Sequence, residues 1–447
     1  MTYLSTSQKG IMFQKILEKL QINELNSMQL ASLESSRSHA DIVLLAPTGS
    51  GKTLAFLLPV LHALDQKKKG VQALVLVPSR ELAMQIEQVF KQMGVEFKVN
   101  CCYGGHPTRI EKNNLSHPPA LLVGTPGRIA YHLRNKNFEV NDLQTLVLDE
   151  FDKSLELGFM EDMSEIIRGL THLRKRLLIS ATSMDEIPEF TGVKRPQVLN
   201  YLHAKSPTKS ELKVKFIRAF DTDKLETLFS LMCFLQNKPT LVFCNHRDSV
   251  DRISALLKEK SLAHGVFHGG MEQEDREKAL IKFRNGSHRI LVTTDLASRG
   301  LDIPEIDAVV HYQLPTTIEV FTHRNGRTAR MNADGTAYML LSAKEFIPPF
   351  IPGHPEAFVL PVDSALPPKS QWQTLYIGAG KKDKINKMDI VGMLLKKGQL
   401  AKEELGRVEV MDTTAYVAVR SNKVQQVLKL IKDEKIKNRK IKIEISA

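Results

Sequence analysis

The stretch at positions 46–53, Ala-Pro-Thr-Gly-Ser-Gly-Lys-Thr, restricts the fold of this chain more than any other. It lies between the apolar runs 42–45 and 54–58, an order that predicts a strand, a glycine turn and a helix. Such a turn brings backbone N–H groups together beside the positive end of a helix, and so binds phosphate groups. Lys52 would contact the outer phosphates and the Thr53 hydroxyl would bind Mg²⁺. The alternative is a structural Gly/Ser turn, and Ala46 departs from the usual pattern, which has glycine there.

Short apolar runs recur after this turn, with amphipathic stretches such as 80–93 and 159–170 between them. The runs predict strands buried on both faces, and the stretches between them predict helices, as does 11–35. Strand–helix alternation indicates a parallel sheet with helices on both faces. Strands are predicted at 42–46, 73–77, 120–123, 145–148 and 177–179. The pattern restarts without a phosphate loop, with strands predicted at 240–244, 264–267, 290–293, 308–312 and 336–341.

Two breaks divide the chain. The stretch 203–213 is polar and lacks periodicity, and a later segment is rich in proline, which interrupts regular elements. We therefore expect an α/β domain at 1–203, a linker at 204–213, a second α/β domain at 214–347, a Pro-rich linker at 348–370 and a small α+β module at 371–447. The pattern of the module is β-α-β-β-α-β.

The net charge of +12 suggests a polyanionic partner, with nucleic acid first. Positions 371–447 hold 17 Lys and Arg residues against 9 Asp and Glu residues, which gives eight of those net charges. The alternative is a solvated basic surface. The four cysteines suit neither a disulfide framework nor a zinc site and indicate reduced thiols in the cytoplasm. We expect no secretory signal and no membrane-spanning helix.

An acidic pair, Asp149-Glu150, directly follows the predicted strand 145–148. Acids at the carboxyl end of a parallel strand face the ligand crevice. Asp149 would hold Mg²⁺ through water, and Glu150 would orient and deprotonate the attacking water. A surface acidic pair at a strand end is the alternative, and the phosphate loop favours the catalytic interpretation.

A second cluster, His-Arg-Asn-Gly-Arg-Thr-Ala-Arg at 323–330, places three arginines close together. Arg327 and Arg330 are one helical turn apart, so both can face one cleft. Arginine stabilises the negative charge that spreads over a phosphoryl group during its transfer. A solvated basic helix is the alternative, and the neighbouring stretch 293–302, Thr-Thr-Asp-Leu-Ala-Ser-Arg-Gly-Leu-Asp, argues against it.

With these motifs in order over about 300 residues, the sequence resembles the DEAD-box RNA helicases. The family's four-residue signature stands here as Asp-Glu-Phe-Asp at 149–152. The other matching elements are Pro-Ser-Arg-Glu-Leu-Ala at 78–83, Gly104-Gly105, Thr-Pro-Gly-Arg at 125–128, Ser-Ala-Thr at 180–182, Gln273-x-x-Arg276, 294–302 and 323–330. The resemblance implies two RecA-like domains with ATP in the cleft between them.

The resemblance also implies residue roles. ATP binding and catalysis would use Gln29 on the adenine edge, the loop residues Thr48, Gly49, Ser50, Gly51, Lys52 and Thr53, Asp302 on the ribose, the acids Asp149 and Glu150, and the arginines Arg327 and Arg330. The RNA track would contain Arg80, Gly105, Thr125, Arg128, Gln273, Arg276 and Thr294. Coupling of hydrolysis to domain movement would use Asp152, Ser180, Thr182 and, at the domain interface, His323.

The C-terminal module is similar to the RNA-binding domain of bacterial DbpA-type helicases, which is RRM-like and associated with large-subunit ribosomal RNA. An RRM stacks bases on aromatic side chains of its sheet, and only Tyr376 and Tyr416 suit that role here. The full aromatic signature is absent. Phosphate contacts from lysines are therefore expected to matter more, with a solvated lysine-rich face as the alternative: Lys381, Lys382, Lys384 and Lys387.

The sequence thus predicts an RNA-dependent ATPase that uses ATP and Mg²⁺ to unwind or remodel structured RNA, above all large-subunit ribosomal RNA during ribosome biogenesis. No membrane or DNA partner is expected. One alternative is an ATP-gated RNA clamp or assembly scaffold that does not separate strands, favoured by Phe151 where the family has alanine. A P-loop ATPase acting on protein or DNA is a third interpretation, and the ordered RNA-track motifs disfavour it.

Overall fold

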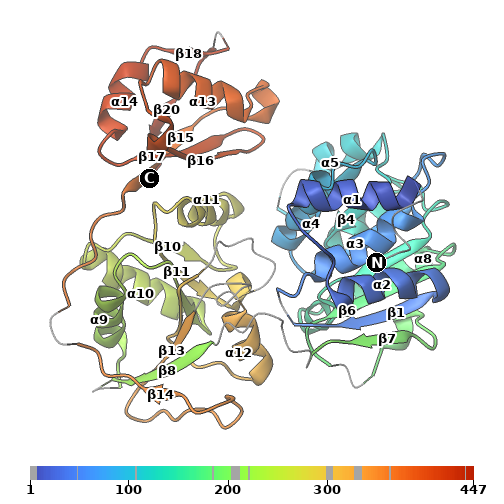
Figure 1. The fold of residues 1–447 in the computed structure, drawn as a ribbon, viewed down its shortest axis with the longest axis horizontal. Helices are drawn as coiled ribbons and strands as arrows, with labels where there is room; N and C mark the ends of the chain where they lie inside the picture. The colour runs from blue at the N-terminus through green and yellow to red at the C-terminus, as the bar shows by residue number, and fades with distance from the viewer. Residues whose placement is uncertain are drawn as a thin grey trace. The chain divides into compact units, whose positions relative to one another are not determined.

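The computed structural model describes residues 8–47, 49–105, 108–183, 186–202, 212–219, 222–298, 306–326, 335–361, 364–437 and 439–446. These residues form two compact units, one mainly before and one mainly after the undescribed stretch 203–211 in the sequence; Figure 1 colours the chain by residue number.

The first unit is built on a seven-stranded parallel sheet of order β3-β4-β2-β5-β6-β1-β7. The central strands are almost wholly apolar, as expected for strands that helices cover on both faces. The strands are β1 (Asp41–Leu45), β2 (Ala73–Leu76), β3 (Val99–Cys102), β4 (Leu121–Gly124), β5 (Thr145–Leu148), β6 (Lys175–Ser180) and β7 (Gln197–Asn200).

Two apolar cores lie on the two faces of this sheet, because successive side chains of a strand point in opposite directions. On β1, Ile42 and Leu44 belong to one core, and Val43 and Leu45 belong to the other. Helices α1 (Gln8–Leu20), α2 (Ser27–Ser38), α3 (Lys52–Ala63) and α4 (Arg80–Gln92) contribute to the first core. Helices α5 (Thr108–Leu115), α6 (Pro126–Arg134), α7 (Phe151–Glu156) and α8 (Met160–Gly169) contribute to the second.

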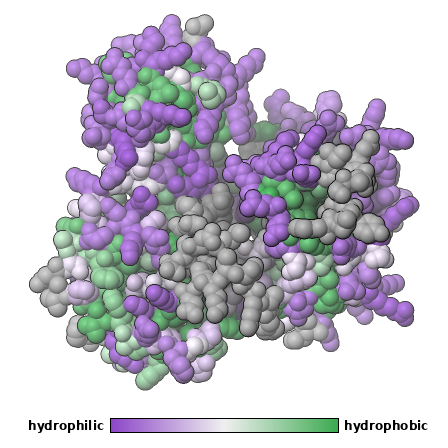
Figure 2. All heavy atoms as spheres, in the orientation of Figure 1, coloured by the Kyte–Doolittle hydropathy of each residue, from purple (hydrophilic) through white to green (hydrophobic). Residues whose placement is uncertain are grey.

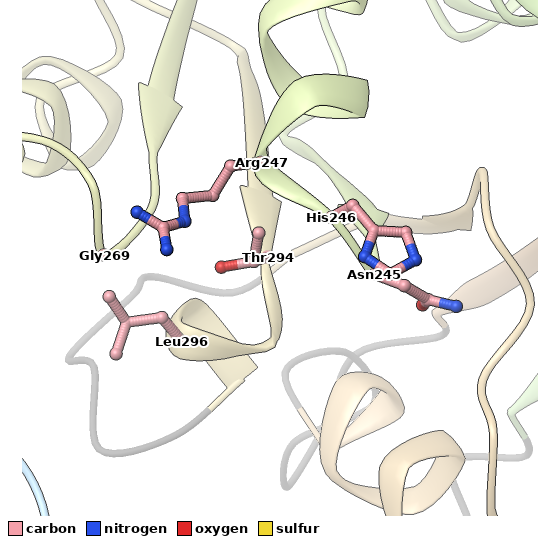
Figure 3. A pocket seen from close by; sticks show the side chains of 6 residues that line it. All are labelled: Asn245, His246, Arg247, Gly269, Thr294 and Leu296. Atoms are coloured by element: carbon pink, nitrogen blue, oxygen red, sulfur yellow. The ribbon is translucent and has the colours of Figure 1, made fainter.

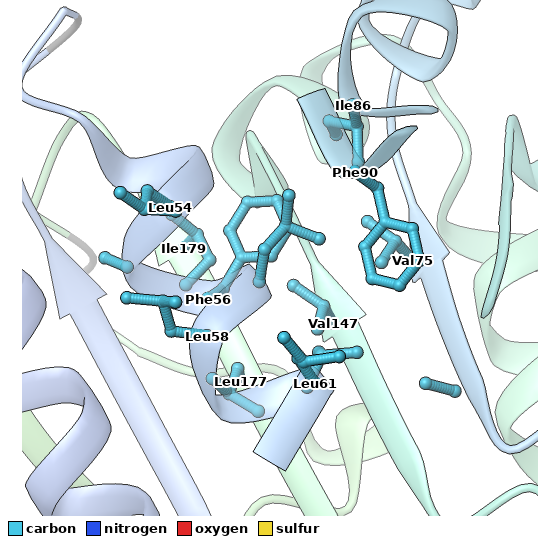
Figure 4. Packing of buried hydrophobic residues seen from close by; sticks show 14 of the residues in the cluster. Leu54, Phe56, Leu58, Leu61, Val75, Ile86, Phe90, Val147, Leu177 and Ile179 are labelled. Carbon is cyan, nitrogen blue, oxygen red and sulfur yellow. The ribbon is translucent and has the colours of Figure 1, made fainter. Parts of the chain in front are cut away.

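Helix α3 is apolar on nearly all sides because it is buried in the first core. Phe56 is fully buried, and Figure 4 shows it among side chains of the sheet and of α4, including Ile179 and Phe90. The helix that follows the phosphate loop is thereby fixed to the sheet, which holds the end of the loop in place.

Phe151 points into the second core. Its side chain is fully buried, and its ring lies 6.3 Å from the ring of Phe190. The aromatic ring where the family has alanine is therefore part of the packing of the second core.

We expect Phe151→Ala to lower the free energy of unfolding of the first unit by about 3–5 kcal/mol, because the truncation leaves a cavity in a filled core. Urea denaturation followed by circular dichroism would measure this. The control in the same unit is Leu157→Ala, because the Leu157 side chain is 51% exposed and its loss should change stability by less than about 0.5 kcal/mol. Equal stabilities of the two variants would contradict the assignment of Phe151 to the core.

The second unit contains another seven-stranded parallel sheet, of order β10-β11-β9-β12-β13-β8-β14. Helices α9 and α10 pack with β9, β12 and β13 in one apolar core, and Phe321 of α12 packs on the other face. Its strands are β8 (Lys213–Arg218), β9 (Thr240–Cys244), β10 (His264–Phe267), β11 (Ile290–Thr294), β12 (Ala308–His311), β13 (Thr336–Leu341) and β14 (Glu356–Ala357). Its helices are α9 (Leu225–Leu235), α10 (Arg247–Glu259), α11 (Gln273–Arg284), the 3₁₀ turn η2 (Asp295–Ser298) and α12 (Ile318–Asn325).

The C-terminal module has a separate antiparallel sheet of order β16-β17-β15-β20. One sheet face and two helices enclose an apolar core that includes Leu375, Ile390 and Val417. Its main elements are β15 (Trp372–Ile377), α13 (Lys387–Lys396), β16 (Leu405–Val410), β17 (Ala415–Arg420), α14 (Val424–Ile431) and β20 (Ile443–Ile445), with a small hairpin of β18 (Lys435–Ile436) and β19 (Arg439–Lys440). The predicted β-α-β-β-α-β order is confirmed.

Several predictions differ from the structure at particular elements. The stretch 11–35 is two helices, because Asn26 caps a new helix after the turn at 21–25. Strands β3 and β7 were not predicted, and both are edge strands whose burial is partial and whose apolar runs are short. Strand β14 lies in the Pro-rich segment and pairs with β8. Most of the predicted linker at 204–213 lies outside the described residues.

Candidate nucleotide and RNA sites

The carboxyl ends of the parallel strands in the first unit meet at one edge of the sheet. Strand β6 lies between β1 and β5, and Ser180 at its end pairs in register with Leu45. The phosphate loop follows β1, and Asp149 follows β5. The topology thereby gathers the loop, the acid pair and Ser180 in one half of the edge, although they are far apart in the sequence.

The phosphate loop has the backbone that its glycines permit. Gly49 and Gly51 have φ values of 83° and 90°, which favour glycine. A Cβ on Gly51 would lie 2.6 Å from Nε2 of Gln29, so space also requires glycine there. Lys52 at the start of α3 donates from Nζ to the Ala46 carbonyl at 2.7 Å. Thr48 lies outside the described residues.

Gln29 is buried directly against the phosphate loop. Its side-chain oxygen accepts from the Asn26 N–H at 3.0 Å, and its Nε2 donates to the Gly51 carbonyl at 3.3 Å. Asn26 in turn caps α2 and donates to the Ser50 carbonyl at 3.0 Å. Gln29 is thus positioned by the loop, and its contact with adenine stays a prediction.

The acid pair lies at the turn between β5 and α7. Asp149 is buried, and desolvation, together with the nearby Glu150 charge, raises its pKa from 3.8 to about 7, against the lowering effect of Lys52. Glu150 has φ 47° and ψ 49°, a left-handed conformation that is unusual for a side chain other than glycine, and its N–H donates to Asp149 at 3.0 Å. A buried carboxylate whose ionisation costs free energy suits a divalent cation, which would restore the charged form.

The raised pKa predicts a pH-dependent stability for protein free of nucleotide and Mg²⁺. Between the unfolded and folded pKa values the native state keeps a proton that the unfolded chain has lost, so stability falls as pH rises. Relative to Asp149→Asn, the wild type should lose about 1.3 kcal/mol of unfolding free energy between pH 5 and 6, and less as the pH approaches 7. Urea denaturation at several pH values, in buffer that contains a metal chelator, measures the unfolding free energy of the wild type and of Asp149→Asn. Parallel pH profiles would contradict the raised pKa.

Three residues predicted to couple hydrolysis to movement are brought together. Thr182 Oγ1 donates to Asp152 Oδ2 at 2.9 Å, and the Ser180 hydroxyl donates to the Thr182 carbonyl at 2.8 Å. The Thr182 N–H donates to Ser180 Oγ at 3.1 Å. A continuous set of hydrogen bonds therefore joins the end of β6 to the first turn of α7, two residues beyond Glu150.

The other half of the same edge carries the predicted RNA-track residues of the first unit. Arg80 follows β2, Gly105 follows β3, and Thr125 and Arg128 follow β4, and these three strands are neighbours. Arg80 packs on Gly105, where a Cβ would lie 2.5 Å from its guanidinium. The sheet order thus separates a nucleotide half, β5-β6-β1, from a second, more basic half, β3-β4-β2.

In the second unit, Thr294 at the end of β11 lines a pocket of about 450 Å³. Figure 3 shows Arg247, from the start of α10, beside Thr294 and the turn at Gly269. Sequence reasoning missed Arg247, because a lone arginine at a helix start carries no motif of its own. The other lining residues are Asn245, His246 and Leu296.

Gln273 and Arg276 lie on the first turn of α11, and Gln273 Nε2 donates to Glu277 at 2.6 Å. His323 is buried in α12. The neighbouring Arg324 is fully buried and binds Asp295 in bidentate fashion at 2.6 and 3.0 Å, so this arginine of the cluster joins α12 to the end of β11. Asp302, Arg327 and Arg330 lie outside the described residues.

Comparison with known proteins agrees with this geometry. Three family models match: DEAD/DEAH box helicase at residues 26–190, Helicase conserved C-terminal domain at 223–332, and DbpA RNA binding domain at 374–445. The chain is 31% identical to the ATP-dependent RNA helicase DbpA of Escherichia coli, over 96% of this chain and 98% of that protein. It is 28% identical to the DbpA of Bacillus subtilis, over 96% of each.

The chain belongs to the DEAD-box ATP-dependent RNA helicases. Solved structures of similar fold include S. cerevisiae Dbp5 bound to RNA and ADP BeF3, with a TM-score of 0.68 and 24% identity over 76% of this chain and 89% of that one. Mss116p bound to ssRNA and AMP-PNP gives a TM-score of 0.65 at 24% identity, over 74% of this chain and 72% of that one. The two seven-stranded sheets of this helicase are accordingly tandem RecA-like folds.

Four lysines of the C-terminal module of this helicase lie in one exposed segment. Lys381, Lys382, Lys384 and Lys387 are all exposed in the loop before α13 and at its first residue. The acids beside them are already paired, Asp383 with Arg439 at 2.9 Å and Asp389 with Lys437 at 2.8 Å. Figure 2 shows hydrophilic side chains around the rim of the visible face of this module.

The two tyrosines on the outer face of the module's sheet are less exposed to solvent than these lysines. The rings of Tyr376 and Tyr416 meet edge to face at 5.7 Å, and Tyr416 is 9% exposed. Thr374 beside them is buried, and its hydroxyl lies 2.8 Å from both Asn285 Nδ2 and Ser287 Oγ in the turn after α11. The two tyrosines that could stack bases are thus largely engaged within the protein.

Proposed function

We propose that this helicase hydrolyses ATP in an RNA-dependent manner to remodel structured RNA, namely large-subunit ribosomal RNA during ribosome assembly. The observation that carries the proposal is the edge of the first sheet, where a phosphate loop, a buried acid pair and a hydrogen-bonded coupling network lie beside a basic, glycine-containing surface. The association with large-subunit RNA rests on the similarity of the C-terminal module to DbpA RNA-binding domains.

In the proposed mechanism, Lys52 and the backbone of the phosphate loop bind the phosphates of ATP. Thr53 and Asp149 would hold Mg²⁺, which would neutralise phosphate charge. Glu150 would orient the attacking water and take its proton, and its left-handed backbone places the side chain at the turn between β5 and α7. Arg327 and Arg330 would stabilise the charge that develops on the transferred phosphoryl group.

RNA enters this mechanism through the β3-β4-β2 half of the edge. Arg80 and Arg128 would contact phosphates, and Gly105 and Thr125 would let the RNA backbone approach closely. Contacts of this kind are tolerant of sequence, so the choice of RNA is assigned to the C-terminal module. There the exposed lysines of the loop 381–387 are better placed for phosphates than the tyrosines of the sheet.

The decisive experiment measures ATP hydrolysis at a fixed protein concentration with three added polymers: large-subunit ribosomal RNA, an unrelated structured RNA of equal length, and DNA of the same sequence as the ribosomal RNA. We expect the strongest stimulation by ribosomal RNA and none by DNA. Equal stimulation by both RNAs would contradict the proposed target, and stimulation by DNA would contradict the proposed RNA track.

An ATP-gated clamp that binds RNA without separating strands was favoured by Phe151, and that residue lies in the core rather than at the site. We therefore propose strand separation. A short duplex should be displaced with ATP, and a non-hydrolysable analogue should not support multiple rounds of displacement. Tight RNA binding with ATP but no displacement would favour the clamp.

The place of action that we propose is the cytoplasm. All four cysteines, Cys101, Cys102, Cys233 and Cys244, are unpaired thiols, as is usual in a reducing compartment. Within the described part of the chain, no helix is long and apolar enough to cross a bilayer.

A further inference from the structure

A buried carboxylate lies under the RNA-track half of the first unit. Glu111 of α5 is only 2% exposed, and each of its oxygens has a separate partner. Its Oε1 accepts from the Tyr103 backbone N–H at 2.8 Å. Its Oε2 lies 2.7 Å from His132 Nε2 and 3.2 Å from Arg128 Nη1. One side chain thus connects the loop after β3 with helix α6 after β4.

The hydrogen bonds of His132 show how this side chain contributes to the cluster around Glu111. The ring is fully buried, and its Nδ1 accepts from Asn137 Nδ2 at 2.9 Å. The proton of the neutral ring is therefore on Nε2, which donates to Glu111. His132 fixes the Glu111 carboxylate in one orientation and needs no charge of its own to do so.

Glu111 acts on both segments of the predicted RNA surface. The Arg128 side chain is 12% exposed, and its guanidinium lies between Glu111 and the Tyr131 ring, 6.0 Å from the ring centre. The Tyr103 N–H that Glu111 holds is two residues before Gly105. The Arg80 guanidinium lies over the Tyr103 ring, 5.9 Å from the ring centre. The carboxylate therefore contacts segments that follow two neighbouring strands, β3 and β4, and Arg80 after β2 contacts one of these segments through Tyr103.

A metal site is the other interpretation of this cluster, because Cys102, Glu111 and His132 offer ligand atoms within 4.8 Å of one another. The chemistry does not favour it. Burial raises the pKa of the Cys102 thiol, whereas a metal ligand must be the thiolate. Both nitrogens of His132 and both oxygens of Glu111 already have hydrogen-bond or ionic partners.

A buried ion pair is also a poor source of stability, because desolvation offsets much of the attraction. A role in orienting the Arg128 side chain explains this buried ion pair better. We propose that Glu111 and His132 are positioning residues for RNA binding, which hold Arg128 and the Gly105 loop in the positions from which they contact the RNA backbone. This inference rests on the proposed RNA-dependent ATPase function and adds two residues that lie beneath the RNA surface.

The test measures the RNA concentration that gives half-maximal stimulation of ATP hydrolysis, together with the rate at saturating RNA. Glu111→Gln keeps the shape, but its NH2 group must face a donor in either orientation, the Tyr103 N–H on one side or Arg128 and His132 on the other. We expect it to raise the half-maximal RNA concentration at least about 10-fold while the saturated rate and ATP binding without RNA change less than about twofold. The matched control is Glu165→Gln, an exposed acid paired with Arg134, which should behave as wild type.

Two further comparisons separate positioning from stability. His132→Gln keeps a donor and should bind RNA nearly as wild type, whereas His132→Phe should weaken RNA binding as Glu111→Gln does. The double variant Arg128→Ala/Glu111→Gln should bind RNA more weakly than Arg128→Ala by a smaller factor than Glu111→Gln causes in the wild type, since both changes remove the Arg128 contact and only the effect on the Gly105 loop remains. Thermal melts of each variant show whether it is folded at the assay temperature.

Failure of the positioning role and failure of the proposed RNA track give different results. If Arg128→Ala weakens RNA binding and Glu111→Gln does not, or if their effects multiply, the positioning role is wrong and the proposed function stands. If Arg128→Ala itself leaves RNA stimulation unchanged, the proposed RNA track is wrong, and the positioning role falls with it.

Discussion

Glu150→Gln is expected to reduce RNA-stimulated ATP hydrolysis at least about 100-fold, because an amide cannot take the proton of the attacking water. Glutamine has nearly the shape of glutamate, so the left-handed backbone at this position and the packing of α7 should be kept. ATP binding and RNA binding should remain within a few-fold of wild type. Steady-state hydrolysis with saturating RNA, together with nucleotide titration, measures both.

The matched control for this prediction is Glu139→Gln, the same substitution at an exposed loop position of the same unit. It should leave hydrolysis unchanged. Lys52→Ala is expected to abolish hydrolysis by a different route, since it removes the cation next to the phosphates and should weaken ATP binding as well. Normal turnover by Glu150→Gln would remove the assigned base and with it the proposed mechanism.

Replacing Lys381, Lys382, Lys384 and Lys387 together by glutamine should weaken binding of ribosomal RNA about 100-fold or more. Each phosphate contact that is lost should also reduce the slope of log affinity against log salt by about one. The side chains are exposed, so the fold of the module should survive. Binding at several salt concentrations, measured by fluorescence anisotropy with a labelled ribosomal RNA fragment, gives both quantities.

The control for the lysine loop is Lys429→Gln/Lys432→Gln, which removes two exposed lysines at the end of α14 in the same module. It should change the affinity only slightly. ATP hydrolysis stimulated by generic single-stranded RNA should be the same in all these variants, because that RNA is assigned to the RecA-like folds. An unchanged affinity in the fourfold variant would return the RNA-binding role to Tyr376 and Tyr416.

The motifs that define the family are local, and the sequence was sufficient to identify them. A phosphate loop needs only a strand, two glycines and a helix in succession, and an acid pair after an apolar run must lie at a strand end. The order of the motifs then indicated the RecA-like folds and the RNA-binding module. The residue roles that this order implies, including those of Asp302, Arg327 and Arg330, stay predictions.

Tertiary structure decided what lies next to what. Sequence alone does not reveal that β6 separates β1 from β5, or that Asp152, Thr182 and Ser180 are joined by hydrogen bonds. Nor does it reveal that Phe151 points into the core, because a residue's direction depends on the turn that precedes it. Glu111 belongs to no motif, and its proposed role follows only from its burial among partners in the segments after β3 and β4. Local patterns determine chemistry, whereas the packing of distant segments determines which side chains can act together.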